Sequence, residues 1–201
     1  MYYDYYDKIK HDLIDGENIL WAGKPKVSFL VSKYLIFIIL FGIMWLGLNS
    51  FMFYSAILTF IYTGVIFPLL FGIPFLAIGF ILTLGVPLYF RRIKKNTEYC
   101  ITNKRIMIFK KSRKGREMET TFIKDIKAIN TKIKSNGIGT IIFGSNTAMA
   151  NMGVNAGFAA YGGGQYGSYY GEMCPVFFDI PDADKVYRIA YDAWSKTKKA
   201  I

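Results

Sequence analysis

One stretch of the sequence decides the fold, and it runs from Tyr34 to Phe90: YLIFIILFGIMWLGLNSFMFYSAILTFIYTGVIFPLLFGIPFLAIGFILTLGVPLYF. It contains no Asp, Glu, Lys, Arg or His. A membrane-spanning helix needs about 20 predominantly apolar residues, because the hydrocarbon core is about 30 Å thick and each helical residue rises about 1.5 Å. The stretch is too long for one helix in a soluble core, so the sequence predicts a protein of the cell membrane.

The basic residues that flank this stretch indicate how often it crosses the membrane. By length alone, two crossings of about 20 residues each and three such crossings both fit, and turn signals at residues 49–50 and 72–74 suit three. Lysines precede the stretch (Lys24, Lys26 and Lys33), and arginines and lysines follow it (Arg91, Arg92, Lys94 and Lys95). Because basic flanks stay in the cytoplasm, an even number of crossings is favoured. We predict a multi-pass hairpin with cytoplasmic N- and C-termini and helices over about residues 33–54 and 65–90.

Aromatic residues and prolines refine this hairpin. Tyrosine prefers the membrane–water interface, which places Tyr34 and Tyr89 at the inner face and Tyr54 and Tyr62 at the outer face, beside a short apolar turn. Prolines are expected to kink the second helix and to leave backbone carbonyls for neighbouring groups to satisfy. These prolines are Pro68, Pro74 and Pro87.

The charge of the chain is concentrated directly after the hairpin. The formal net charge is +11, and residues 91–134 hold fifteen Lys or Arg against four acidic residues. Such a block indicates cytoplasmic topology first, and attraction to anionic lipid second, worth about 1 kcal/mol per basic residue near the surface. Nucleic acid is not expected as a partner, because the block adjoins a membrane segment and shows no nucleic-acid motif. Membrane lipids are the partners that the charge favours.

The sequence offers few groups for catalysis or metal binding. One histidine, His11, and two cysteines, Cys100 and Cys174, are too few for a zinc site. Both cysteines are interpreted as small buried side chains and not as a disulfide. The sequence also lacks a recognisable nucleophile with a base, or a carboxylate pair in a cleft motif. We therefore predict no catalytic residue, no metal and no cofactor, and expect a protein that is not an enzyme.

The segment before the hairpin, residues 1–26, predicts a short helix and a strand. Apolar and aromatic residues fall on one face of a helix over residues 2–14, namely Tyr2, Tyr6, Ile9 and Leu13. This helix either packs on the soluble domain or lies on the membrane surface. Residues 17–22 form an apolar run that Gly23 and Pro25 follow, which is typical of a strand. A strand isolated in this way needs a sheet from elsewhere in the chain.

After the hairpin, residues 91–201 change to the pattern of strands. Runs at 97–102 and 105–109 are separated by a tight reversal, and Lys110 to Arg116 is expected to form a polar, basic turn. Met118, Thr120 and Phe122 alternate with polar residues, which predicts a half-buried strand on that face. Runs at 126–133 and 138–143 flank Asn136-Gly137, a dipeptide typical of type I′ hairpin turns. Five strands joined by short turns indicate an antiparallel meander.

The last third of the chain combines a glycine-rich insertion with a regular end. Residues 144–171 carry no charge and are rich in Gly, Ala, Asn and Tyr. We interpret them as a flexible insertion or, alternatively, as an aromatic–glycine segment for self-association or lipid contact. A strand is expected at 175–180. The following helix has Asp182 as its N-cap and an apolar stripe that includes Trp194.

Seven antiparallel strands closed by one amphipathic C-terminal helix resemble the pleckstrin-homology (PH-like) barrel. Three segments carry the resemblance: Glu17-Asn18-Ile19-Leu20-Trp21-Ala22-Gly23-Lys24-Pro25, Tyr99-Cys100-Ile101-Thr102-Asn103-Lys104-Arg105, and Asp125-Ile126 with Gly137-Ile138-Gly139-Thr140-Ile141. Together they are similar to the bacterial PH-domain membrane proteins, in which a two-helix hairpin precedes a cytoplasmic PH-like domain. The resemblance covers residues 17–143 and 175–197. The chain departs from it at the glycine-rich insertion, where a short hairpin is expected.

The resemblance implies a fold class and a set of structural residues. The fold class is a membrane-anchored α+β protein, with a two-helix transmembrane hairpin and a PH-like antiparallel β-barrel or sandwich capped by a C-terminal amphipathic helix. Its structural motif residues are Trp21, Gly23, Tyr99, Thr102, Asn103, Arg105, Gly137 and Trp194. Arg105 begins a strand where its guanidinium can clamp a neighbouring loop, and we favour this structural role over ligand binding.

The resemblance also implies a binding or scaffolding module. The leading hypothesis is an adaptor anchored at the inner face of a bacterial membrane. Its basic turn would contact anionic head groups through Lys110, Lys111, Arg113, Lys114 and Arg116, and a solvated turn is the other interpretation of these residues. The alternative function is a self-assembling or accessory protein of a membrane complex, a homo-oligomer or a partner of another membrane protein. A transporter subunit is disfavoured, because the predicted helices hold no ionisable group.

Overall fold

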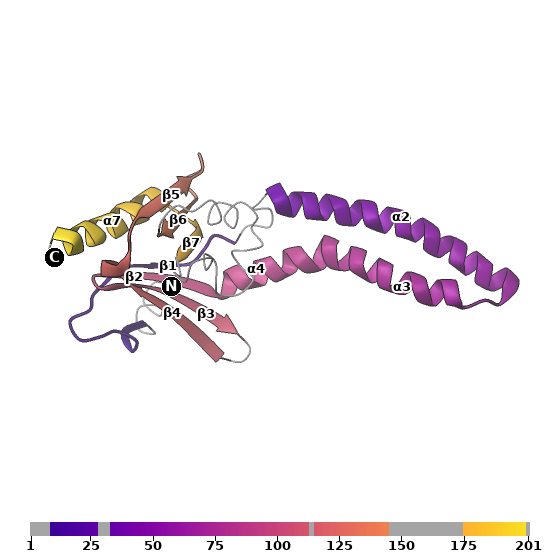
Figure 1. Cartoon of the computed structure of the whole chain (residues 1–201), viewed down its shortest axis with the longest axis horizontal. Coiled ribbons are helices and arrows are strands. Elements are labelled where there is room, and N and C mark those ends of the chain that lie inside the picture. Colours follow the sequence, from indigo (N-terminus) through magenta and orange to yellow (C-terminus); the bar gives the residue numbers. More distant parts are fainter. Residues whose placement is uncertain (1–8, 28–32, 113–114, 145–174, 200–201) are drawn as a thin grey trace. The chain divides into compact units, whose positions relative to one another are not determined.

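The computed structural model describes residues 9–27, 33–112, 115–144 and 175–199, and they fall into two compact units (Figure 1). One unit, here called the helical unit, contains the described residues 33–92. The other, here called the sheet unit, combines residues 9–27 with the described residues from 93 onward. The sheet unit is therefore built from chain segments that lie on both sides of the helical unit in the sequence.

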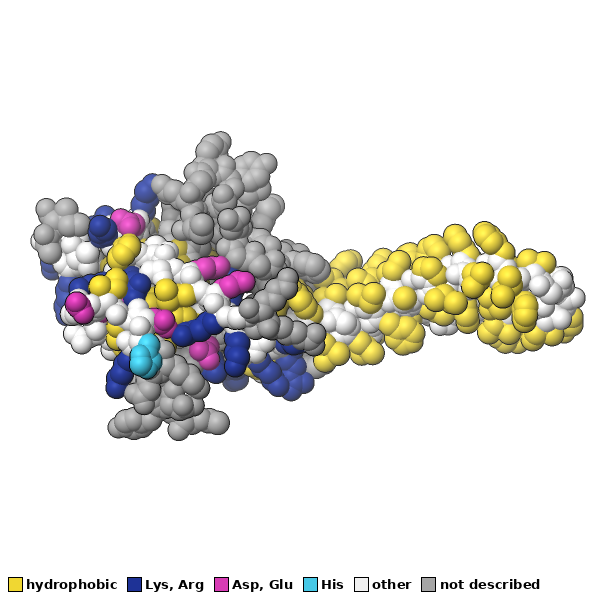
Figure 2. All heavy atoms as spheres, turned by 90° about the horizontal axis from the view of Figure 1, so that it is seen from below, with side chains coloured by type: hydrophobic (Ala, Val, Ile, Leu, Met, Phe, Trp, Pro, Cys, Tyr) yellow, Lys and Arg dark blue, Asp and Glu magenta, His cyan; other side chains and the backbone are white. Residues whose placement is uncertain are grey.

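The helical unit is a hairpin whose two arms are long and apolar. Helix α2 spans Lys33–Thr63, and the second arm consists of α3 (Phe67–Phe80), a π-helical segment η1 (Ile81–Gly85) and α4 (Val86–Asn96), whose last residues belong to the sheet unit. Two stretches, Leu35–Thr63 and Phe67–Asn96, are long and apolar enough to cross a membrane, judged by length and composition. Figure 2 shows hydrophobic side chains over the visible face of the hairpin.

The first arm ends at Thr63, nine residues later than the predicted end at Tyr54. Helix α2 continues past Tyr54 and ends at Thr63, because the hydroxyls of Ser55, Thr59 and Thr63 donate to carbonyls of their own helix and offer no alternative to helical backbone. The chain turns at Gly64, whose φ of 72° is a left-handed conformation that glycine adopts without a Cβ clash. The expected short apolar turn is thus confined to residues 64–66.

The prolines act differently from one another. Pro68 lies in the first turn of α3, where a missing N–H costs no hydrogen bond, so it starts the helix and does not kink it. Pro74 lies inside α3. Pro87 is the second residue of α4, and the N–H of Val86 before it reaches back to the Ile81 carbonyl in the wider π pattern. The α-helical ladder therefore lacks one donor at Pro74, which has no N–H, and widens to the π pattern over Ile81–Gly85, just before Pro87.

Glycines let the two arms of the hairpin approach closely. A Cβ built on Gly79 would lie 2.5 Å from Leu46, one on Gly72 would lie 2.7 Å from Phe53, and one on Gly42 would lie 2.5 Å from the Thr83 hydroxyl. Small residues at such contacts are typical of helix pairs in membranes. The Trp45 indole N–H donates to the Phe75 carbonyl across the hairpin (2.9 Å), so its polar atom is satisfied inside an apolar surface.

The sheet unit contains two antiparallel sheets and a C-terminal helix. The first sheet has the order β1 (Ile19–Gly23), β2 (Thr97–Thr102), β3 (Arg105–Ser112), β4 (Gly115–Phe122). A short 3-10 turn η2 (Ile123–Asp125) leads to the second sheet, with the order β5 (Ile129–Ile133), β6 (Gly139–Phe143), β7 (Val176–Ile180). Helix α7 (Ala183–Lys199) follows. The structure is thus α+β, with two antiparallel sheets and two long apolar helical arms.

The strand that precedes the hairpin in the sequence is completed into a sheet by the strands that follow the hairpin. Strand β1 pairs with β2, with Ala22 opposite Cys100 and Gly23 opposite Tyr99. The main core lies between the two sheets and α7 and includes Tyr99, Ile101, Phe143, Phe177 and Val186. A smaller apolar cluster covers the other face of the first sheet; it consists of Ile9, Ala22, Cys100, Met107 and Phe109, with Leu13 and Ile19 packed against it. The N-terminal segment therefore packs on the sheet unit through Ile9 and Leu13.

The N-terminal helix differs from the sequence prediction in its end. Residues 9–10 are helical, but the chain turns at residues 11–12 and not after residue 14, and Gly16 is left-handed (φ 69°). The predicted helical residues Tyr2 and Tyr6 lie outside the described residues.

Two predictions for strands β3 and β4 were wrong. The basic turn from Lys110 to Arg116 does not exist as a loop of that length, because β3 runs to Ser112 and β4 begins at Gly115. On β4 the exposed face carries Met118 and Phe122, 45% and 43% exposed, together with Thr120, while Glu119 and Thr121 on the other face are half-buried. The β4 strand is an edge strand, so its alternation does not mark a core face.

The hairpin between β5 and β6 has a different turn from the one predicted. The Gly137 N–H donates to the Lys134 carbonyl (2.9 Å), and Gly137 has a φ of 75°. Asn136 lacks the positive φ that a type I′ turn requires at both central residues. Asp182, the expected N-cap of α7, directly precedes the helix but has a left-handed φ of 51° instead of the extended backbone of an N-cap.

Candidate functional site

Three of the basic residues proposed for lipid contact, Lys110, Lys111 and Arg116, lie where β3 ends and β4 begins. Lys110 forms an ion pair with Glu119 (2.7 Å) on the neighbouring strand, and Lys111 is exposed opposite Arg116. Arg116 pairs with Asp12 (2.8 Å) and stacks on the Phe109 ring at 4.1 Å. Arg113 and Lys114 lie outside the described residues. Two of the five basic side chains are therefore engaged within the unit.

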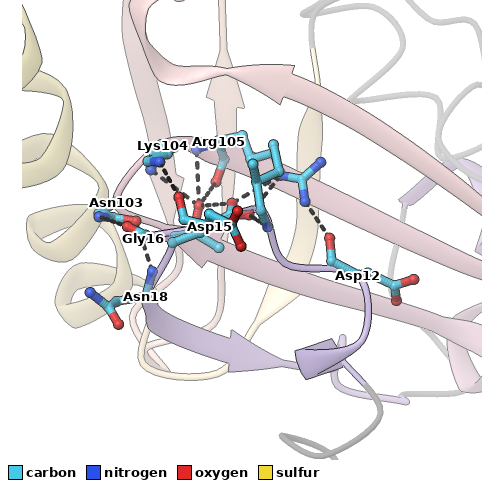
Figure 3. A network of polar contacts seen from close by, with 10 residues as sticks. Asp12, Asp15, Gly16, Asn18, Asn103, Lys104 and Arg105 are labelled. Carbon is cyan, nitrogen blue, oxygen red and sulfur yellow. Dashed lines mark hydrogen bonds and ion pairs between the residues drawn. The ribbon is translucent and has the colours of Figure 1, made fainter.

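The reversal between β2 and β3 builds a buried polar junction with the segment that precedes β1 (Figure 3). The Arg105 Nε–H lies 2.9 Å and 3.1 Å from the two Glu17 carboxylate oxygens. Both side chains are buried, and the Arg105 guanidinium also donates to the Asp12 carbonyl. The planar guanidinium can hold a carboxylate and a carbonyl at once because its N–H groups point in fixed directions. Arg105 thus contacts the loop of residues 12–17.

Thr102 joins the carboxylate to the turn. Its hydroxyl lies 2.6 Å from the Glu17 carboxylate and donates to it. The same oxygen accepts the backbone N–H groups of Arg105 (2.9 Å) and Lys104 (3.2 Å), which closes the reversal. A hydroxyl is the smallest side chain that both donates to an acid and accepts from the backbone. Thr102 is fully buried as a result of these contacts.

The two turn residues hold the backbone of the same N-terminal loop. The Asn103 side chain accepts from the Asn18 N–H (2.9 Å) and donates to the Gly16 carbonyl (3.2 Å). The Lys104 ammonium donates to the Asp15 carbonyl (2.6 Å). Every side chain from Thr102 to Arg105 therefore bonds to residues 12–18 (Figure 3). The arrangement fixes the loop of residues 12–18 to a hairpin turn.

The electrostatics of the junction favour an ionised Glu17. Burial opposes ionisation of this carboxyl, but hydrogen bonds from Arg105, from the Ile14 N–H and from Thr102 together hold the pKa of Glu17 below its ordinary value. Burial raises the pKa of the neighbouring Cys100 thiol to about 12, so this cysteine is a neutral, unreactive thiol at physiological pH. Burial also raises the pKa of Tyr99.

A second buried charge pair lies at the end of β7. The Lys94 ammonium is 2.9 Å from the Asp179 carboxylate, with the two side chains 3% and 11% exposed. Lys134 reaches the other oxygen of Asp179 at 3.5 Å. Close by, the Tyr99 hydroxyl accepts the Phe178 N–H (3.1 Å). Sequence patterns did not reveal this pair, since neither residue belongs to a motif or to a periodic stripe.

The remaining motif residues have structural contacts. Trp21 packs against Phe177 with ring centroids 6.0 Å apart, and a Cβ on Gly23 would lie 2.4 Å from the Trp21 ring, so only glycine leaves room for that indole. Gly137 closes the β5–β6 turn and its carbonyl accepts the Ala183 N–H at the start of α7. The Trp194 indole donates to the Ile126 carbonyl (2.8 Å).

The contacts of these residues join separate segments of the sheet unit to one another. Within the described ranges, no group of three or more His, Cys, Asp or Glu side chains is placed to hold a metal ion. Glu17 and Asp12 were missed in the sequence because their partners lie far away in the chain. Comparison of the chain with protein-family models, with curated proteins and with solved structures finds no match.

Proposed function

We propose that the chain is a non-catalytic adaptor that its hairpin anchors in a membrane. The observation that carries this proposal is the surface of the helical unit. Phe51 and Phe67 are 75% and 71% exposed, and most other apolar side chains of both arms are also open to the surroundings. A water-soluble protein rarely exposes a continuous apolar surface of this kind. Such a surface is compatible with the hydrocarbon core of a membrane.

The pairing of β1 with β2 supports two crossings with both ends on one side. Strand β1 precedes the hairpin and β2 follows it, yet the two share one sheet. An odd number of crossings would separate them by a bilayer. The basic residues on both flanks of the hairpin favour the cytoplasmic side for this sheet unit.

Cysteine labelling tests this orientation in whole bacterial cells. In a Cys174→Ser background, Val65→Cys at the reversal should react with a membrane-impermeant maleimide added outside. Lys127→Cys in the sheet unit should react only after the cells are lysed. The native Cys100 is buried and serves as the internal control for a folded protein. Labelling of Lys127→Cys in intact cells would place the sheet unit outside and contradict the proposal.

The sheet unit supports a PH-like fold as the second part of the proposal. Four strands, then three strands, and a closing amphipathic helix follow the order expected of that barrel or sandwich. Domains of this architecture commonly present loops for ligand recognition on a rigid scaffold. The end of the β3–β4 hairpin is the part of this unit that we propose as the contact with anionic head groups, through Lys111, Arg113 and Lys114, because Lys110 and Arg116 are engaged within the unit.

Nanodiscs with and without anionic lipid test the lipid contact. An environment-sensitive fluorophore on Ser112→Cys of the full chain should shift when phosphatidylglycerol replaces half of the phosphatidylcholine. The triple change Lys111→Glu, Arg113→Glu, Lys114→Glu should abolish the shift, because reversed charges are repelled by the anionic surface. A matched reversal at the end of α7 (Lys196→Glu, Lys198→Glu, Lys199→Glu) should preserve it. Equal loss of the fluorescence shift in both variants would show that the shift depends on net charge and not on the β3–β4 hairpin.

A second function, assembly through protein contacts, is favoured by the edge strand β4. This strand ends the first sheet and exposes Met118 and Phe122 on one face. Exposed edges of this type accept a strand from another chain. Light scattering of the detergent-solubilised chain separates the two functions: a discrete oligomer that Met118→Lys converts to a monomer favours assembly, and a monomer that binds anionic lipid favours the adaptor. Deletion of residues 146–171, within the glycine-rich insertion, tests the same alternative at a separate place.

A further inference from the structure

Three segments of the sheet unit meet at Asp179, the fourth residue of β7. Its carboxylate contacts Lys94 in the last turn of α4 (2.9 Å) and Lys134 beside the β5–β6 turn (3.5 Å). Its backbone carbonyl accepts the Lys26 N–H (2.7 Å). Lys26 precedes α2, and Lys94 ends the second arm of the hairpin. One residue therefore bonds to the chain on both sides of the helical unit.

The conformation and burial of Asp179 are unfavourable by themselves. Its φ of 46° lies in the left-handed region, where a residue other than glycine is strained unless its surroundings fix it. Lys94 is among the few buried charged residues of the chain. Removing two charges from water offsets much of their mutual attraction, so a buried ion pair is poor evidence of a stabilising role. The contacts of Asp179 are better explained by what they hold in position.

We propose that Asp179 is a conformational latch that transmits movement of the last turn of α4 to β7. The two lysines give the latch two positions. When Lys94 is in place, the carboxylate is held by a buried partner; when α4 withdraws Lys94, the more exposed Lys134 keeps the same carboxylate paired. The β7 strand then changes its arrangement without leaving a buried charge unpaired, which would be costly.

A source of such movement follows from the length of the hairpin, and this step depends on the proposed membrane anchoring. Helix α2 has 31 residues, about 46 Å at about 1.5 Å per residue, against about 30 Å of hydrocarbon. Helices longer than the bilayer is thick respond to its thickness by tilting. A change of tilt is felt first at the ends of the arms, and Lys94, the partner of Asp179, lies in the last turn of the second arm.

Amide hydrogen exchange of the full chain in nanodiscs of short-chain and long-chain lipid tests the latch. In the wild-type chain, exchange of residues 93–96 and of β7 should differ by about threefold or more between the two lipids. The double variant Lys94→Met, Asp179→Asn removes both charges together, so neither is left buried alone, and asparagine tolerates the left-handed backbone. In this variant the difference in amide exchange between the two lipids should disappear for β7 and remain for residues 93–96 of α4.

Two further variants make the test specific. Glu98→Gln breaks the more exposed Lys24–Glu98 ion pair (2.8 Å) near the same end of the hairpin and should leave the thickness response unchanged. Lys134→Met removes the second position of the latch and should raise the exchange of β7 in the lipid in which Lys94 withdraws. The latch proposal is wrong if amide exchange of β7 in the wild-type chain is the same in both lipids. It is also wrong if the difference between the lipids is equally large in the double variant. If the chain does not enter nanodiscs, the membrane anchoring itself is wrong and the latch falls with it.

Discussion

Arg105 holds a carboxylate and a backbone carbonyl with one side chain, which lysine cannot do. Its guanidinium contacts both oxygens of Glu17 and the carbonyl of Asp12. We expect Arg105→Ala to lower the free energy of unfolding by about 3–5 kcal/mol, because a buried carboxylate loses its cation. Arg105→Lys should recover part of this loss. Chemical unfolding of the full chain in detergent micelles measures both.

An exposed arginine provides the control for that experiment. Arg188 pairs with Asp184 on the surface of α7 (3.0 Å), and Arg188→Ala should cost less than about 1 kcal/mol. Equal losses for the two alanine variants would show that the junction contributes no more than a surface ion pair.

Glu17 gives the junction a dependence on pH. Its pKa is lower in the folded chain than the ordinary value of 4.5, so the ionised carboxylate stabilises the fold above that pH. The stabilisation is lost as pH falls through the folded-state pKa. The difference in unfolding free energy between the wild-type chain and Glu17→Gln should therefore be fully present well above pH 4.5 and shrink as pH falls below 4.5. A difference that stays constant as pH falls would contradict the ionised state.

The sequence indicates half of this junction. The order Thr102-Asn103-Lys104-Arg105 marks a turn and a guanidinium suited to clamping a loop. The other half, Glu17 and Asp12, lies 88 and 93 residues away from Arg105 in the chain. Turn signals and periodicities describe local backbone, so they contain no information on which distant carboxylate meets the guanidinium.

At the scale of elements, the hairpin depends on glycines where its arms touch. Gly42→Ala should destabilise the helical unit by about 1–3 kcal/mol, because the new Cβ would lie 2.5 Å from the Thr83 hydroxyl and 3.0 Å from a backbone nitrogen. Gly47 lies on the same helix with nothing within 4 Å of such a Cβ. Gly47→Ala should be neutral or stabilising through helix propensity. Thermal unfolding of both variants in detergent is the measurement, and an equal effect at both positions would contradict the packing.

The elements themselves were more predictable than their ends and faces. Charge-free composition was sufficient to predict two arms, and alternation located most strands within a few residues. The reversal was placed too early because Tyr54 was taken as an interface marker, although the backbone-bonded Ser55 and Thr59 let α2 continue. The outward face of β4 was assigned to the core because alternation shows that two faces differ but not which of them is covered.

For the whole molecule, the interleaved order of the two units predicts what can be removed. Replacing residues 28–92 by a flexible Gly-Ser linker should yield a soluble, folded sheet unit, because β1 and β2 remain in one chain. Removing residues 1–27 should prevent folding, since β2 loses its partner strand and Ile9 no longer covers the smaller cluster. Amide dispersion in NMR spectra distinguishes a folded from an unfolded product. A well-dispersed spectrum after removal of residues 1–27 would contradict this architecture.

Because the hairpin divides the sheet unit in the sequence, it also determines the order in which the strands of the first sheet are synthesised. The ribosome releases β1 first, and that strand has no mate until every apolar residue of both arms has emerged and β2 appears behind them. If one arm were inserted on the wrong side, β1 could not pair with β2 and its apolar side chains would stay exposed. Quality-control proteases recognise such incompletely folded chains. In the membrane-anchored chain that we propose, the first sheet can therefore form only when both arms have been inserted with their ends on one side.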